Sequence, residues 1–224
     1  MDIMLIILMV ALSILFIFVF NYIFEKNGIK NIYLIYNVIS FILSFKILEI
    51  VQININANII VSSMFNSLTY FIIEKTTPRE YKEIIKQTLT VNIIIAFVFL
   101  ISSLYIGSVN DTITVHMNNI FIKNYKILIG YPIITTINQI LILLIYNNIK
   151  SEKINNNLRM IITNLNVLMA ESILFIITGY IFKIDFIHLL ILIISNYLIK
   201  VLITSIYTPF TNYIIKEKKV KLWI

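Results

Sequence analysis

The sequence predicts an all-α fold, a polytopic transmembrane bundle of about seven helices. Hydrophobic residues make up 59% of the chain and charged residues only 13%, whereas about a quarter of a soluble domain is charged. The apolar residues fall in runs of about 20, which is the length that crosses a bilayer as a helix. Basic residues gather in alternate gaps between these runs. This is the pattern of a multi-pass protein of the cell membrane, whose first partner is the lipid bilayer.

Seven apolar runs follow one another along the chain. They cover residues 3–24, 31–51, 55–74, 84–106, 127–149, 159–182 and 186–214. The first run has no basic start and no small-residue cleavage site, which favours a retained helix over a signal peptide. The third and sixth runs carry Ser, Asn, Thr and Glu, so they are the least hydrophobic. The last run is longer than a bilayer requires.

The basic residues predict the orientation of these helices. Of the 18 Lys and Arg residues, 13 follow the first, third, fifth and seventh runs, three lie in the opposite gaps and two fall inside runs. Because cytoplasmic loops are rich in Lys and Arg, the N-terminus is expected outside and the C-terminus in the cytoplasm. Opposite locations of the two ends require an odd number of spans, in agreement with seven.

Several classes of function lack their motifs. The chain has no Cys, and its two His residues are far apart, so we expect no metal site. Walker A, HExxH and GxSxG motifs are absent, so ATP hydrolysis, metalloproteolysis and esterase chemistry have no support. We therefore expect a protein that is not an enzyme and has no cofactor. The net charge of +7 comes from the gaps between runs and predicts no nucleic-acid partner.

Polar residues recur at helical spacing inside the apolar runs. The stripes are Ser62-Asn66-Tyr70-Glu74, Thr135-Gln139 with Asn138 beside it, Asn164-Glu171, and Asn196-Lys200-Thr204. Ser, Thr and Asn often join membrane helices to one another, and that is the simpler interpretation of each. Glu171 and Lys200 differ, because an ionisable group inside a membrane is expected to be functional. They could also form a structural ion pair. Lys46 and Glu49 lie near a run end, where they could pair locally or reach the interface.

Parts of the chain resemble the queuosine precursor transporters, a vitamin uptake transporter family. The segments that carry the resemblance are residues 131–150, 158–180, 196–214 and the loop FIIEKTTPREYKEII, with FKILEIV upstream. The residues that match are Lys46, Glu74, Gln139, Arg159, Lys200, Thr208 and Pro209, with Glu171 in place of an Asp. Ile142, Leu168, Tyr70 and Thr77 depart from the family pattern.

The resemblance covers about residues 35–215. It implies that residues 27–224 form a six-helix carrier domain and that residues 1–26 are an extra N-terminal helix. It also implies import of 7-cyano-7-deazaguanine or a related 7-deazaguanine. The substrate-binding residues expected on this basis are Asn66, Tyr70, Glu74, Gln139, Glu171, Lys200, Lys46 and Arg159. Amide side chains can read both donors and acceptors of a purine edge, and Tyr70 or Phe175 could stack on the ring.

The sequence leaves other possibilities open. Energy coupling is either proton symport or facilitated diffusion followed by trapping, and a homodimer is one possible oligomeric state. The chain could instead be the substrate-binding subunit of an energy-coupling-factor vitamin importer, although the Ala-rich stripes that such subunits use for docking are scarce here. A non-transporting membrane scaffold is the remaining alternative, and it predicts that Glu171 and Lys200 tolerate apolar substitution.

Overall fold

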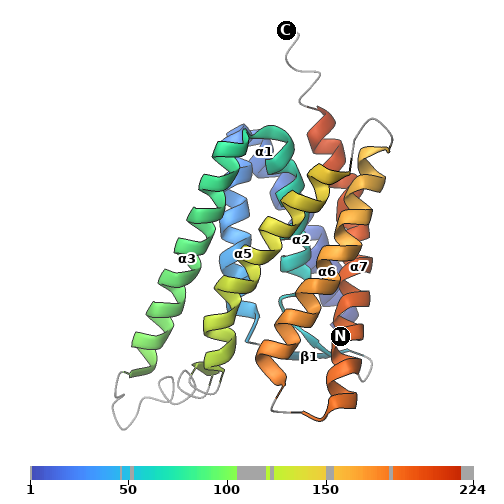
Figure 1. Ribbon diagram of the computed structural model, residues 1–224. Coiled ribbons are helices and arrows are strands. Elements are labelled where there is room, and N and C mark those ends of the chain that lie inside the picture. The colour runs from blue at the N-terminus through green and yellow to red at the C-terminus, as the bar shows by residue number, and fades with distance from the viewer. Residues whose placement is uncertain are drawn as a thin grey trace.

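The computed structural model is a bundle of long helices with one small β-hairpin (Figure 1). It describes residues 2–45, 47–50, 53–104, 120–121, 124–149, 154–181 and 184–217. The helices are α1 (Asp2–Leu43), α2 (Ile59–Lys75), α3 (Pro78–Leu104), α5 (Tyr125–Asn148), α6 (Asn156–Tyr180) and α7 (Phe186–Glu217), and the strands are β1 (Ile47–Ile50) and β2 (Ile53–Asn56).

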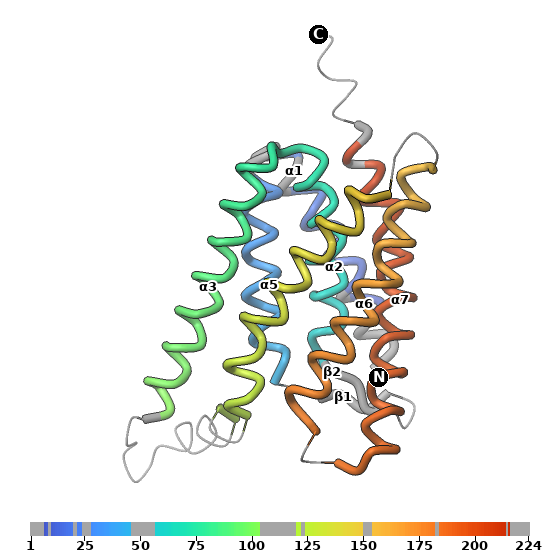
Figure 2. Tube along the Cα trace, in the orientation of Figure 1, coloured from blue at the N-terminus to red at the C-terminus, as the bar shows by residue number. Residues whose placement is uncertain are grey.

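Helix α1 folds back on itself. The Tyr36 hydroxyl donates a hydrogen bond of 3.0 Å to the main-chain oxygen of Ser13, 23 residues earlier. A straight helix would separate these two residues by about 35 Å, so the chain must reverse between them. Figures 1 and 2 show α1 rising from the N-terminus and descending again beside α5. Its two limbs correspond to the first two apolar runs of the sequence.

The prediction for residues 47–50 was wrong, because they form a strand and not the end of a helix. The second run was expected to stay helical to residue 51, but α1 ends at Leu43, where the Ser44 hydroxyl donates to the Phe41 carbonyl at 2.6 Å. The antiparallel strands β1 and β2 follow, with Ile47 opposite Asn56. Residues 53–56 alternate Ile and Asn, and a β-branched residue at every second position favours a strand. The fold is therefore a helical bundle with a hairpin, and α2 starts only at Ile59.

The other helices lie close to the predicted runs, with one clear difference. Helix α3 starts at Pro78, six residues before the predicted start at 84. The Thr77 hydroxyl accepts from the Glu80 amide at 3.3 Å, and the Glu80 carboxylate accepts from the Thr77 amide at 3.0 Å. This capping box, with proline at the first helical position, starts the helix in the polar segment before the apolar run.

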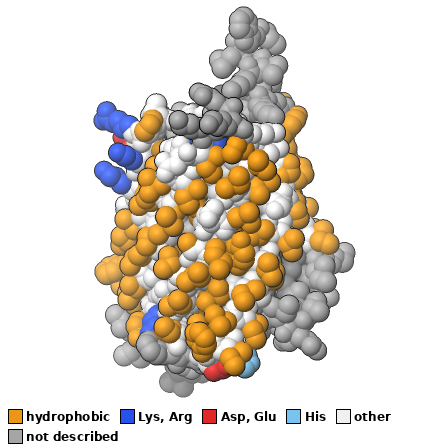
Figure 3. Space-filling model, turned by 45° about the vertical axis from the view of Figure 1, so that its right-hand side comes forward, with side chains coloured by type: hydrophobic (Ala, Val, Ile, Leu, Met, Phe, Trp, Pro, Cys, Tyr) orange, Lys and Arg blue, Asp and Glu red, His pale blue; other side chains and the backbone are white. Residues whose placement is uncertain are grey.

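The surface of the bundle is that of a helical membrane protein. Within the described residues, four stretches are long and apolar enough to cross a membrane: Pro78–Ser103, Tyr125–Asn148, Asn156–Tyr180 and Phe186–Tyr213. Large hydrophobic side chains are exposed along these helices. They cover the face of the molecule shown in Figure 3, whereas charged side chains lie near its two ends. An apolar belt this extensive is too large for a protein that is surrounded by water.

Helix α2 occupies the centre of the bundle. Every residue from Ile59 to Ile72 is buried, and α2 packs against α1 and α7, with α5 alongside. Helix α1 begins and helix α7 ends at opposite ends of the bundle (Figure 1). The ends of α2 and α5 and the starts of α3 and α6 lie at the same end as the last turn of α7, and we name this the basic end after Lys75, Arg79, Lys82 and Arg159.

Candidate functional site

Four polar side chains from four helices meet in the core. This central cluster consists of Asn66 on α2, Asn138 on α5, Glu171 on α6 and Lys200 on α7. The Lys200 ammonium lies 2.6 Å from Glu171 Oε1. The amide groups of Asn138 and Asn66 donate to Glu171 Oε2 at 2.7 and 2.9 Å. No member is more than 7% exposed.

The central cluster is balanced in charge and hydrogen bonding. The Glu171 carboxylate accepts from three donors and faces one cation, so its negative charge is compensated inside the apolar bundle. Transfer of charged groups from water into the bundle costs free energy. Removal of one partner destabilises the fold strongly, because it leaves the other charge buried without compensation. The sequence predicted that Glu171 and Lys200 could form an ion pair, and the structure confirms that they do.

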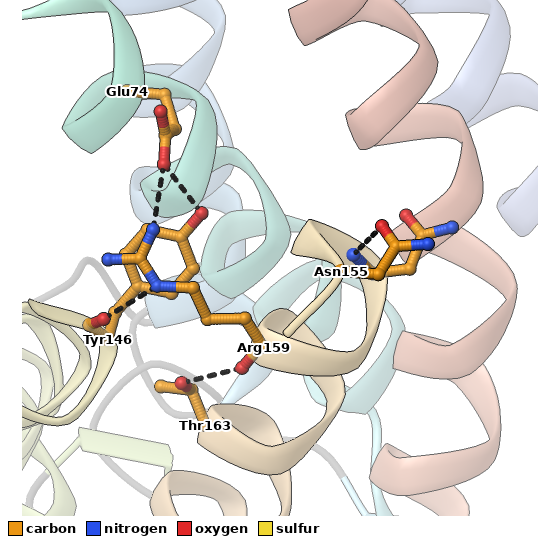
Figure 4. A network of polar contacts seen from close by, with 6 residues as sticks. Glu74, Tyr146, Asn155, Arg159 and Thr163 are labelled. Atoms are coloured by element: carbon orange, nitrogen blue, oxygen red, sulfur yellow. Dashed lines mark hydrogen bonds and ion pairs between the residues drawn. The ribbon is translucent and has the colours of Figure 1, made fainter. Parts of the chain in front are cut away.

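A second cluster, the Glu74–Arg159 cluster, lies nearer the basic end (Figure 4). It joins Glu74 on α2, Tyr146 on α5 and Arg159 on α6. The Arg159 guanidinium stacks on the Tyr146 ring with its central carbon 3.5 Å from the ring centroid, and it lies 3.2 Å from Glu74 Oε1. The same carboxylate oxygen accepts from the Tyr146 hydroxyl at 2.7 Å. Three helices are thereby tied together at this end.

Tyr70 lies between the two clusters. It is four residues beyond Asn66 and four before Glu74 on α2, so the three side chains share one helix face. Its hydroxyl donates to Asn164 Oδ1 at 2.5 Å, and its ring lies 5.1 Å from that of Tyr146. The polar stripe predicted on α2 thus runs from the central cluster to the basic end.

Gln139 does not join the central cluster. Its amide nitrogen donates to the Tyr33 hydroxyl at 2.5 Å and to the Thr88 hydroxyl at 3.2 Å. Its main-chain oxygen accepts from the Tyr81 hydroxyl at 2.9 Å. Gln139 therefore connects α5 to α1 and α3, on another side of α5 from Glu171. Lys46 lies outside the described residues.

Sequence reasoning missed the roles of three buried asparagine side chains. Asn138 was noted only as a neighbour of Gln139, yet it is the α5 residue that contacts Glu171. Asn37 and Asn92 were not selected at all, although Asn37 Nδ2 donates to Asn92 Oδ1 at 2.6 Å and Asn92 donates to the Thr135 hydroxyl at 3.0 Å. Both asparagines lie inside apolar runs, which is the signal that could have found them.

Asp185 and His188 lie exposed at the opposite end of the bundle. Asp185 precedes α7, and its carboxylate accepts from the main-chain amide of His188 at 3.3 Å and lies 2.5 Å from the His188 ring. Slight desolvation acts to raise the pKa of Asp185, but the hydrogen bonds and charge of His188 outweigh it and lower this pKa below its usual value. Among the described residues, no three His, Asp or Glu side chains gather as a metal site would require.

Comparison with known proteins gives no match. No family model, no curated protein and no solved structure is significantly similar to this chain.

Proposed function

We propose that the chain is a multi-pass carrier of the cell membrane that imports a 7-deazaguanine precursor of queuosine. The observation that carries this proposal is the central cluster: an ion pair and two amides, brought together from four helices and buried in the core. Ionisable groups inside a membrane bundle usually mark a substrate or ion pathway. The resemblance of the sequence to queuosine precursor transporters supplies the substrate class.

The chemistry of the cluster suits a neutral, planar, purine-like substrate. The ring N–H and the amino group of a deazaguanine form a pair of donors, and a carboxylate can accept both. In the proposed complex Glu171 accepts this pair while Lys200 continues to balance its charge. Asn66 and Asn138, released from Glu171, then donate to the carbonyl oxygen of the substrate. The substrate thus replaces two hydrogen bonds that the protein otherwise makes to itself.

The proposed topology has seven membrane passes, with the basic end in the cytoplasm and the N-terminus outside. The reversal of α1 gives two limbs, and α2, α3, α5, α6 and α7 add five more passes in alternating directions. Lys75, Arg79 and Lys82 lie at one end of this bundle, and the positive-inside rule assigns that end to the cytoplasm. The Glu74–Arg159 cluster would then close the substrate path on the cytoplasmic side.

The decisive experiment is genetic complementation. The chain is expressed in a cell that makes no queuosine precursor and has lost its own importer, and queuosine in tRNA is measured after 7-cyano-7-deazaguanine is supplied. We expect restoration by the wild type and loss of it in Glu171→Gln and Asn138→Ala. The matched control is Asn166→Ala, because Asn166 is exposed on α6 and, among the described residues, its amide bonds only to the Ile162 carbonyl of its own helix. A wild type that fails to restore queuosine while present in the membrane refutes the substrate.

Transport by the purified chain and by its variants distinguishes the proposal from the two alternatives. A substrate-binding subunit of an energy-coupling-factor importer would need a partner ATPase, so purified chain in liposomes would bind substrate without moving it. A membrane scaffold would keep its function when the ion pair is replaced by apolar residues. We expect transport by the purified chain alone and loss of transport on Lys200→Met.

A further inference from the structure

The start of α3 carries three exposed basic side chains in a row. Arg79, Lys82 and Lys86 are spaced by three and four residues, so they lie on one face of the helix. The row is about 10 Å long, because each residue of a helix adds about 1.5 Å. Lys and Arg side chains project together from the molecule at the basic end (Figure 3). We name these three residues the basic row.

Two of the three cations have no carboxylate partner. The Arg79 guanidinium lies 3.6 Å from Glu83 Oε1, and both side chains are exposed. Among the described residues, no carboxylate pairs with Lys82 or Lys86. The neighbouring Glu80 carboxylate accepts a main-chain amide in the capping box that starts α3. The exposed face of this segment therefore presents three cations and one carboxylate, which leaves a net charge of +2.

The same face of α3 becomes apolar further along the helix. Ile93, Phe97 and Ile101 continue the spacing of the basic row, and all three are exposed. The opposite face, which includes Tyr81 and Asn92, is buried against the bundle. The outward face of α3 therefore changes from basic to apolar in the direction that leads away from the basic end.

The basic row lies at the level of the lipid headgroups. A helix crosses the hydrocarbon layer with about 20 residues, and this length, counted back from the end of α3 at Leu104, reaches about residue 84. Arg79 and Lys82 precede that level. Lys86 lies within one turn of it, and its long side chain tilts toward the start of the helix, which brings the ammonium group to the headgroup layer. The exposed apolar residues that follow lie beside the acyl chains.

We propose that the basic row binds the phosphate of an anionic glycerophospholipid, whose acyl chains lie along the apolar part of the same face. An anionic lipid fits, because its phosphate keeps a net negative charge, whereas the amine of a zwitterionic headgroup cancels that charge. Lys82 and Lys86 supply the two uncompensated cations, and Arg79 contributes less because it is shared with Glu83. The lipid site depends on neither the substrate nor transport.

Local fluorescence quenching measures which lipid occupies this face. The chain contains no cysteine, so an introduced cysteine carries a fluorescent label at one known position. Ile93→Cys places the α3 label about 10 Å beyond Lys86 on the face of the basic row. Ile140→Cys places a matched α5 label, because Ile140 is exposed on α5 and the last turn of that helix has no basic residue.

The labelled full-length chain is reconstituted in nanodiscs that contain phosphatidylcholine and phosphatidylglycerol. Only one of the two lipids has brominated acyl chains, which quench the label on contact, and the two lipids exchange this role between samples. The ratio of quenching gives the local preference for the anionic lipid. Both leaflets have the same composition, so the orientation of the chain does not affect the result.

Each uncompensated cation should raise the local preference for phosphatidylglycerol roughly fivefold, so we expect about a 20-fold preference at the α3 label and about twofold or less at the α5 label. Lys82→Gln and Lys86→Gln should each lower the preference at the α3 label about fivefold, and the double variant should abolish it. Glu83→Gln should raise it several-fold, because it releases Arg79. Lys126→Gln removes the same charge from the first turn of α5 and should leave it unchanged.

Three results would overturn the lipid site. The first is an equal preference at the two labels, or a preference that survives the loss of both lysines. The second is a preference that does not rise in Glu83→Gln, which would show that charge at this face does not select the lipid. The third is loss of the preference in millimolar inorganic phosphate at constant ionic strength, which would assign the basic row to a soluble phosphate. None of these measurements uses transport, so failure of the proposed function leaves them decisive.

Discussion

The ion pair between Glu171 and Lys200 predicts how the unfolding free energy changes when either charge, or both, is removed. Lys200→Met removes the cation but keeps a side chain of similar length, so Glu171 keeps two amide donors and loses its only charged contact in the central cluster. Glu171→Gln removes the negative charge and leaves Lys200 unbalanced. The double variant removes both charges and retains an oxygen that can accept from the two asparagines. Comparison of the three variants with the wild type isolates the interaction between the two charges.

The burial of the ion pair determines how much unfolding free energy each variant loses. Lys200 is 3% exposed and Glu171 is 7% exposed, so each single variant leaves one charge in the bundle with almost no contact to solvent. Breaking a buried pair by removing one partner typically costs about 3–5 kcal/mol, whereas replacing the whole pair by neutral groups is often close to neutral. We therefore expect each single variant to lose about 3 kcal/mol or more of unfolding free energy. The double variant should lose no more than about 1 kcal/mol, so the coupling energy between the two charges is roughly 5 kcal/mol.

Reversible unfolding in bicelles measures these differences, and transport is measured on the same preparations. The carrier hypothesis adds that the double variant, although stable, transports nothing. Single variants that lose less than about 1 kcal/mol, with effects that add within about 0.5 kcal/mol, would show that the two charges are not paired in a buried site. A stable double variant with full activity would instead show that the pair serves the fold alone.

Three further predictions concern local contacts. A methyl group on Gly130 would lie 2.5 Å from Thr178 Cγ2, where α5 approaches α6, so Gly130→Ala should lose about 1–3 kcal/mol of unfolding free energy. Adding Thr178→Ser should recover most of this loss, because it removes the contacting methyl group. Equal stability of the single and the double variant contradicts this explanation. Arg159→Lys keeps the charge but loses the planar contact with Tyr146, so it should lower the unfolding free energy by about 1 kcal/mol, and an unchanged value would show that the stacking contributes little. Asp185→Ala should lower the unfolding midpoint at neutral pH, because the lowered pKa of Asp185 means that its ionised form stabilises the fold. The difference in unfolding midpoint between Asp185→Ala and the wild type should fade as the pH falls below about 4, because Asp185 then takes up a proton. A difference in midpoint that does not depend on pH contradicts this explanation.

The boundaries of the helices show how local the sequence signal is. The limits of α5, α6 and α7 follow from the length of their apolar runs, because apolar length is a property of one segment and the bilayer fixes it. The start of α3 was missed because a capping box, and not hydropathy, begins that helix. The hairpin of β1 and β2 was missed because residues 47–50 were assigned to the end of the second apolar run and residues 55–56 to the start of the third.

The polar residues of the candidate site were found only in part. The stripe of Asn66, Tyr70 and Glu74 was predicted from its spacing and lies along a single path. Gln139 was expected at the substrate and lies in a separate network, whereas the adjacent Asn138 contacts Glu171. Neighbouring residues of a helix point about 100° apart, so the choice between them depends on the rotation of α5 against α6. Spacing within one helix carries no information about that rotation.

The sequence by itself determined that this chain is a helical membrane protein, where most of its helices lie, and which gaps between them carry positive charge. These properties depend on composition and on distance along the chain, and the bilayer acts on each segment separately. Only the tertiary structure decided that α1 reverses, that Lys200 pairs with Glu171 and that Asn66 and Asn138 complete the cluster. Such pairings join residues from different helices, and the packing of those helices is what brings a buried charge to its partner.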